Sequence, residues 1–174
     1  NAIFNEGEYA DKVVARALKK DKRWGSSDRK FVAETIYEVV RWKRLYAEIA
    51  EVKEPFNRED LWRMFAVWAV LRGYPIPDWR QLEGTPERKI KGRFDELSKI
   101  RTLKESIPDW MDELGVKELG EKVWTKELAA QNEQAKVVLR VNRLKTDPKK
   151  LKAELFDMDI ETIQDDNYPD ALIL

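Results

Sequence analysis

Apolar side chains recur at helical spacing through most of the first 130 residues. The segment 59–72 begins with two acidic residues, is apolar almost all round and is followed by Gly73, so it predicts a buried central helix. Gly115 is expected to break the helical pattern near it, and Trp62 and Trp68 are expected in the core. Six or seven helices are predicted in total, among them 7–20, about 28–50, 86–100, 108–114 and 117–131.

The segment 28–50 separates apolar and polar residues onto opposite faces of a helix. The apolar face holds Val32, Ile36, Val39, Val40, Tyr46 and Ala47, and the polar face holds Lys30, Glu34, Tyr37, Arg41, Arg44 and Glu48. We therefore predict one continuous helix that presents an aromatic ring and guanidinium groups to solvent.

The pattern changes after residue 135. Residues 137–142 are rich in β-branched side chains, Asp147-Pro148 is a helix start, and 160–164 and 171–174 read as two further short strands. The predicted fold class is mainly α, with a helical domain over 1–132 followed by an incomplete β-α-β-β subdomain over 133–174.

The composition excludes several kinds of site. The chain has no cysteine and no histidine, which removes disulfides, thiol nucleophiles, imidazole bases and the usual zinc ligands. It also has no glycine-rich phosphate-binding motif. We therefore expect no catalytic, metal or cofactor residues in these 174 residues.

The longest apolar run, 65–71, is too short to cross a bilayer, and no signal peptide is visible at the start. The expectation is a protein of the cytoplasm with no membrane contact.

The net charge is zero, but basic and acidic residues are concentrated in different stretches of the chain. Residues 12–44 hold eleven Lys or Arg against four acids, and residues 136–152 hold seven against Asp147 alone. Residues 153–174 hold seven acids and no base. The two basic stretches are candidate contacts for a polyanion, although charged helix faces are also ordinary solvated surface.

Several motifs resemble one family along nearly the whole chain. Asp28-Arg29, Tyr37 and Arg41-Trp42-Lys43-Arg44 are similar to the NusB-like domain of RsmB/Sun-type ribosomal-RNA cytosine-5 methyltransferases. Residues 107–110 and Trp124 are similar to that family's linker. The run 139–146, Leu-Arg-Val-Asn-Arg-Leu-Lys-Thr, and the run 168–172 are similar to the opening of its catalytic half.

The resemblance implies a NusB-like helical bundle followed by the start of an RNA-recognition-like α/β subdomain. It implies a parent enzyme that transfers a methyl group from S-adenosylmethionine to carbon 5 of a cytosine in RNA. That family uses two cysteines and a glycine-rich cofactor loop, all missing here. The expectation is therefore a truncated, non-catalytic part whose partners are RNA and its own catalytic domain.

Two groups of residues are the candidate RNA contacts, because basic side chains neutralise phosphates and an aromatic ring stacks on an unpaired base. For Tyr37 the alternative is a packing role, and for Arg41 it is an ion pair with Glu34, Glu38 or Glu48. Asn142 is expected to fix a turn. The N-terminal basic cluster is Arg29, Lys30, Tyr37, Arg41 and Arg44, and the C-terminal basic cluster is Lys136, Arg140, Arg143 and Lys145.

The function expected from the sequence is RNA binding and substrate positioning for such a methyltransferase. One alternative is a stand-alone NusB-like module for antitermination or ribosome assembly, which would have no β-α-β-β segment. Another is a helical scaffold with no nucleic-acid role.

Overall fold

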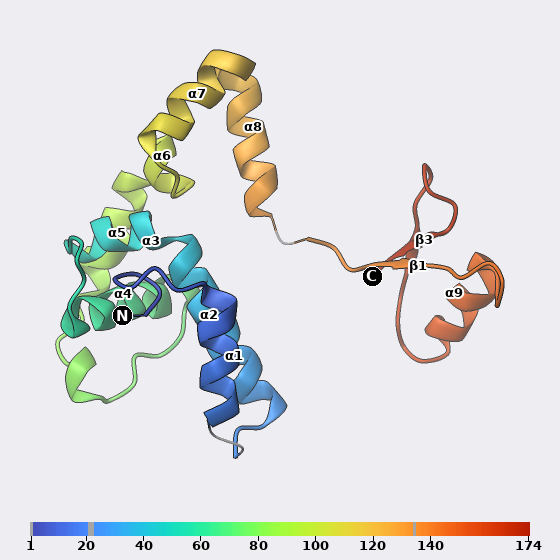
Figure 1. Cartoon of the computed structure of the whole chain (residues 1–174), viewed down its shortest axis with the longest axis horizontal. Coiled ribbons are helices and arrows are strands. Elements are labelled where there is room, and N and C mark those ends of the chain that lie inside the picture. The colour runs from blue at the N-terminus through green and yellow to red at the C-terminus, as the bar shows by residue number, and fades with distance from the viewer. Residues whose placement is uncertain (1, 21–22, 134) are drawn as a thin grey trace. The chain divides into compact units, whose positions relative to one another are not determined.

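The computed structural model describes residues 2–20, 23–133 and 135–174. The chain divides into two compact units, residues 1–130, here the helical unit, and 131–174, the C-terminal unit. The predicted mainly helical class is confirmed for these residues (Figure 1).

The helical unit is built around α4. Its helices are α1 (Ala10–Lys20), α2 (Ser26–Arg41), α3 (Lys43–Ala50), α4 (Arg58–Arg72), the 3₁₀ turn η1 (Arg80–Leu82), α5 (Glu87–Leu97), α6 (Arg101–Lys104), α7 (Asp109–Leu119) and α8 (Glu121–Asn132).

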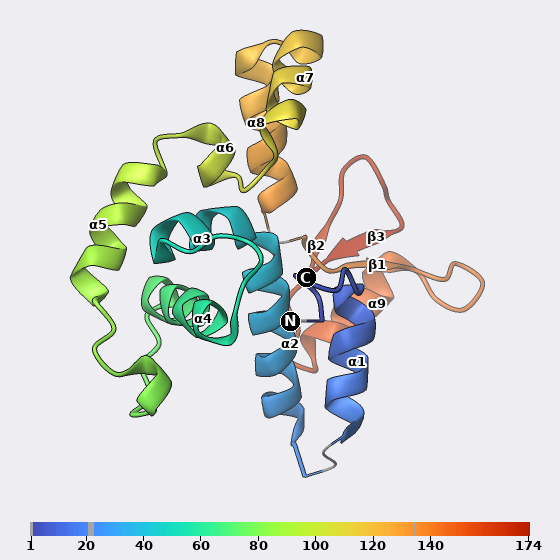
Figure 2. The same ribbon diagram turned by 60° about the vertical axis from the view of Figure 1, so that its left-hand side comes forward.

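Helix α4 begins and ends where its sequence signals indicate. The side chain of Asn57 accepts hydrogen bonds from the N–H groups of Glu59 and Asp60, and Gly73 ends the helix with a positive φ. Met64, Val67 and Trp68 are buried against α3 and α5, so the prediction of a central buried helix is confirmed (Figure 2). Trp62, expected in the core, is only half-buried.

The prediction of one continuous helix over 28–50 is wrong, because the chain turns at Trp42 between α2 and α3. The backbone N–H of Arg44, in the first turn of α3, donates to Oγ of Ser106 at 3.1 Å. A hydroxyl from a distant segment thus satisfies a donor that has no partner within its own helix. The apolar periodicity runs on across Trp42, and for this reason the sequence pattern does not show the break.

Gly115 was predicted to break a helix, and this is also wrong. Helix α7 runs through Gly115 to Leu119 and ends at Gly120, whose φ is +76°. A Cβ added at Gly115 would lie 2.2 Å from Cε2 of Trp124. The glycine is therefore required by the close packing of the Trp124 indole against α7, where no side chain fits.

An ion-pair network holds the same helices. The guanidinium of Arg101 donates to both carboxylate oxygens of Asp112, at 2.8 and 2.9 Å, and also to Glu121 at 3.1 Å. The indole N–H of Trp124 donates to Asp112 at 2.8 Å. These bonds, the one from Arg101 above all, lower the pKa of Asp112, and the same bond raises the pKa of Arg101.

The C-terminal unit is a small sheet with one helix. The strands β1 (Val138–Arg140), β3 (Ala171–Ile173) and β2 (Ile163–Gln164) lie in that order, and both pairs are antiparallel. Helix α9 (Pro148–Phe156) starts at Asp147, whose side chain accepts from the N–H of Lys150. Leu172 and Val141 are fully buried. The predicted β-α-β-β order is confirmed within the described residues.

Replacing Gly115 by alanine is expected to destabilise the helical unit by about 1–3 kcal/mol, because the new methyl group overlaps the Trp124 ring. The control is Gly92→Ala in α5, also a helix of eleven residues, where an added Cβ meets no atom within 4 Å. That control is expected to stabilise the protein by about 0.5–1 kcal/mol. Urea unfolding measures both, and equal effects would contradict the packing argument.

The lowered pKa of Asp112 predicts a pH dependence. Because its folded-state pKa lies below the unfolded-state value, its contribution to stability is complete at neutral pH and is lost as the pH falls through the folded-state pKa. Asp112→Asn should therefore lower the free energy of unfolding by about 1–3 kcal/mol at about pH 7, and by clearly less at about pH 3.

Urea titrations of wild type and variant at both pH values test this prediction. Asp95→Asn, at an exposed position of α5 with no recorded partner among the described residues, controls for the loss of one negative charge. A deficit of the same size at both pH values would show that the carboxylate charge of Asp112 does not stabilise the fold.

Candidate nucleic-acid interface

Arg29 of the N-terminal basic cluster connects α2 to the end of α1. Its guanidinium donates to the carbonyl of Trp24 at 3.1 Å and to that of Leu18 at 3.0 Å. The neighbouring Lys30 lies 3.8 Å from the carboxylate of Glu34, one turn further along α2. An exposed pair of this kind adds little stability, so Lys30 can still reach a ligand, whereas Arg29 has a structural role.

Tyr37 and Arg41 lie further along α2. Tyr37 is 45% exposed, so its ring is accessible for stacking, and that role stays a prediction. The guanidinium of Arg41 lies over the Trp42 ring, with 5.0 Å from its carbon to the ring centroid. Burial lowers the pKa of Arg41, and the carboxylate of Glu105, itself 4% exposed, opposes this shift. The acidic neighbour that acts on Arg41 is thus Glu105, from outside α2.

Arg44 is bound to the segment between α6 and α7. Its guanidinium donates to the carbonyl of Ile107 and forms an ion pair of 2.7 Å with Asp109. Because the chain turns at Trp42, Arg44 belongs to a different helix from Arg41. These bonds are made between residues more than sixty positions apart, and no local pattern could have shown them.

The N-terminal basic cluster is spread along α2 and onto α3. Arg29 and Arg41 are separated by twelve positions on α2, which is about 18 Å along the helix axis. Arg29 and Arg44 already donate to protein carbonyls, which leaves fewer of their N–H donors for a phosphate. RNA contact by this cluster remains a prediction.

The C-terminal basic cluster differs, because most of its charges have no recorded ion pair with a described residue. Lys136, Arg140 and Lys145 are exposed, and no ion pair is recorded for them with any described residue. Arg143 is paired with Asp170 at 2.6 Å, which is the one ion pair recorded in the described part of this unit. Among the described residues, the acidic stretch 153–174 thus supplies one recorded ion-pair partner to this cluster, Asp170.

Asn142 organises the turn that carries this cluster. Its side-chain oxygen accepts from the N–H of Leu144 at 3.0 Å, and its carbonyl accepts from Lys145 and Thr146. This geometry confirms the interpretation of Asn142 as a turn residue. Residues 142–146 thus form a hydrogen-bonded turn that carries the Lys145 side chain.

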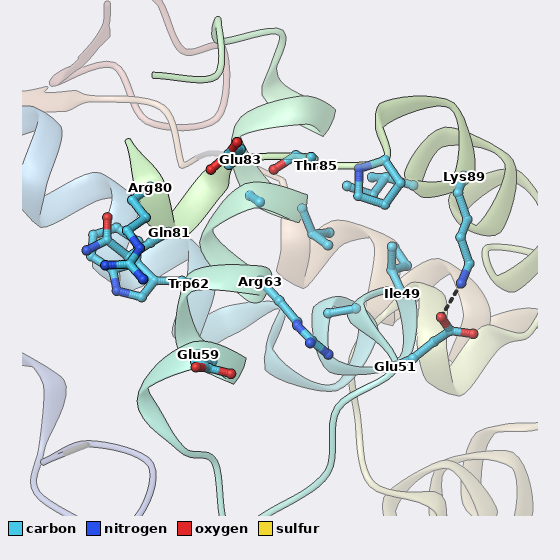
Figure 3. Close-up of a pocket in the computed structure, with 16 residues that line it drawn as sticks. Ile49, Glu51, Glu59, Trp62, Arg63, Arg80, Gln81, Glu83, Thr85 and Lys89 are labelled. Atoms are coloured by element: carbon cyan, nitrogen blue, oxygen red, sulfur yellow. Dashed lines mark hydrogen bonds and ion pairs between the residues drawn. The ribbon is translucent and has the colours of Figure 1, made fainter. Parts of the chain in front are cut away.

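The helical unit also contains a pocket that the sequence analysis missed. It has a volume of about 670 Å³ and lies between α3, α4, η1 and the start of α5 (Figure 3). The buried side chains of Ile49, Ala66, Val67 and Ile90 line it. Trp62, which the sequence pattern places in the core, lines this pocket. The remaining polar and charged lining is Glu51, Glu59, Arg63, Arg80, Gln81, Glu83, Thr85 and Lys89.

The described residues offer neither a metal site nor a membrane-spanning helix. No group of three or more acidic side chains there could hold a metal ion. Within the same residues, no helix is both long and apolar enough to span a membrane.

Comparison with known proteins gives one family. A family described as the RsmF/B-like methyltransferase, ferredoxin-like domain matches residues 107–174, which include α7, α8 and the whole C-terminal unit. No curated protein matches the chain. The antiparallel sheet with its helix agrees with the α/β character of this domain. Residues 107–174 are thus similar to the ferredoxin-like domain of RsmF/B-like methyltransferases.

Proposed function

We propose that this chain binds RNA and positions it for an rRNA cytosine-5 methyltransferase of the RsmB/Sun type. The observation that carries the proposal is the C-terminal basic cluster, where Lys136, Arg140 and Lys145 are exposed without recorded ion pairs among the described residues. The family match includes all of them.

Unpaired surface cations favour a polyanionic ligand. When lysine or arginine neutralises a phosphate, condensed counterions are released, and this release drives binding. The Asn142 turn fixes the backbone that carries Lys145, which lowers the entropy lost on binding. Contacts of this kind position an RNA backbone without reading its sequence.

The chemical step belongs, in this proposal, to a separate catalytic domain. Methyl transfer from S-adenosylmethionine to cytosine carbon 5 in this family needs cysteines and a glycine-rich loop, and these 174 residues contain neither. The cofactor would bind to that domain, in the cytoplasm, while the present chain holds the substrate.

The match to the ferredoxin-like domain favours this role over a stand-alone NusB-like module, which would not carry such a segment. The NusB-like character of the helical unit is part of the proposal and rests on the motifs of α2, because the family match begins at residue 107.

Replacing Lys136, Arg140 and Lys145 together by glutamine should weaken binding of structured ribosomal RNA. With three phosphate contacts removed, the slope of log affinity against log salt concentration should become shallower by about 2–3. Filter binding or fluorescence anisotropy at several salt concentrations measures this slope.

The matched control neutralises Lys91, Lys99 and Lys126, which are exposed in the helical unit and have no recorded ion pairs with described residues. This variant loses the same charge and should keep the wild-type slope. If both triple variants lose affinity equally, net charge explains the binding and the C-terminal basic cluster is not the RNA site.

A further inference from the structure

Two arginines that line the pocket of the helical unit have no recorded ion pair with a described residue. The carboxylate of Glu51, at one end of the pocket, forms an ion pair with Lys89 (Figure 3). Arg93 lies 3.4 Å from the same carboxylate. Arg63 and Arg80, by contrast, have no recorded hydrogen bond or ion pair with a described residue. Guanidinium groups are suited to bidentate binding of phosphate, and these two are available for it.

Trp62 contributes an aromatic surface to the same pocket. The rings of Phe65 and Trp79 meet it at 88° and 76°, with centroid distances of 5.8 and 5.9 Å. Both contacts are edge-type, and no parallel ring is recorded against Trp62 in the described part of the chain. An indole with no stacked partner can take a planar ligand, and stacking of a nucleobase on such a ring is favourable for every base.

The remaining polar groups suit the other parts of a nucleotide. The carboxylates of Glu59 and Glu83 have no recorded partners among the described residues, and they can accept from exocyclic amino groups or sugar hydroxyls. The amide of Gln81 can donate and accept. Buried Ile49, Val67 and Ile90 give the pocket an apolar part against which a base or sugar can pack.

We propose that this pocket binds a single nucleotide unit, with the base on Trp62 and the phosphate on Arg63 and Arg80. Its volume of about 670 Å³ is in the range of small-molecule sites and holds one nucleotide, not an extended strand. The ligand is either a free mononucleotide or one unpaired nucleotide of an RNA, since both present the same base and phosphate. The site belongs to the helical unit and uses none of the C-terminal basic cluster.

The test uses the full chain, with cytidine and uridine monophosphates, cytidine without phosphate, and a short oligouridylate as probes. Calorimetry gives the affinities, and the indole N–H signal of Trp62 in NMR spectra, assigned with Trp62→Phe, reports contact at the ring. The expected result is a shift of this signal on adding a nucleotide, with weaker binding of cytidine than of its monophosphate.

Arg63→Gln with Arg80→Gln should weaken mononucleotide binding at least about tenfold, because two charge-assisted contacts are lost. Arg88→Gln, exposed on α5 and outside the pocket lining, is the control and should change nothing. Thermal unfolding verifies that the double variant folds, as expected from exposed side chains without partners. The triple glutamine variant of the C-terminal basic cluster should bind mononucleotides like wild type, which separates this proposal from the proposed function.

Competition identifies the source of the ligand. If oligouridylate displaces the mononucleotide and shifts the Trp62 signal, the ligand is an unpaired nucleotide of RNA, and if only mononucleotides bind, it is a free nucleotide. The proposal is overturned if no nucleotide shifts the Trp62 signal, or if the arginine double variant binds as wild type does. A short capped peptide, Glu-Leu-Lys, serves as a non-nucleotide probe. The proposal is also overturned if this peptide binds at Trp62 and nucleotides do not.

Discussion

Arginine bonds to the segment 106–112 connect α7 and α8 to the preceding helices of the helical unit. Arg44 binds Ile107 and Asp109 from α3, and Arg101 binds Asp112 from α6. Together they hold α7, and through the Asp112–Trp124 bond α8, to the helices that precede them. A guanidinium that already donates to protein groups has fewer of its five N–H donors left for a phosphate. The availability of each basic residue for RNA thus depends on whether the fold already uses it.

This constraint separates residues that look alike in the sequence. The arginines of α2 and α3 and the cations after residue 135 have the same chemistry and similar density. In the structure the former contact carbonyls, a tryptophan ring and carboxylates, whereas three of the latter have no recorded partner among the described residues. The family match begins at Ile107, whose carbonyl Arg44 binds, so this arginine links the matched segment to the earlier helices.

Elements fixed by local chemistry were predictable from the sequence. Gly73 ends α4, Asp147-Pro148 starts α9, and the short strands follow their β-branched runs. The features missed depend on distant partners. The turn at Trp42 is accompanied by a bond from Arg44 to Ser106, and Gly115 makes room for Trp124. The pocket beside Trp62 is formed by segments from residue 49 to residue 90, and no local periodicity shows such a convergence.

Lysine-specific acetylation with mass spectrometry, with and without bound ribosomal RNA, tests most directly whether unpaired C-terminal cations carry the RNA. The account predicts that RNA slows acetylation of Lys136 and Lys145. Lys43, which pairs with Glu54 at 2.5 Å, should react at an unchanged rate. Protection of Lys43 with none at Lys136 and Lys145 would contradict it.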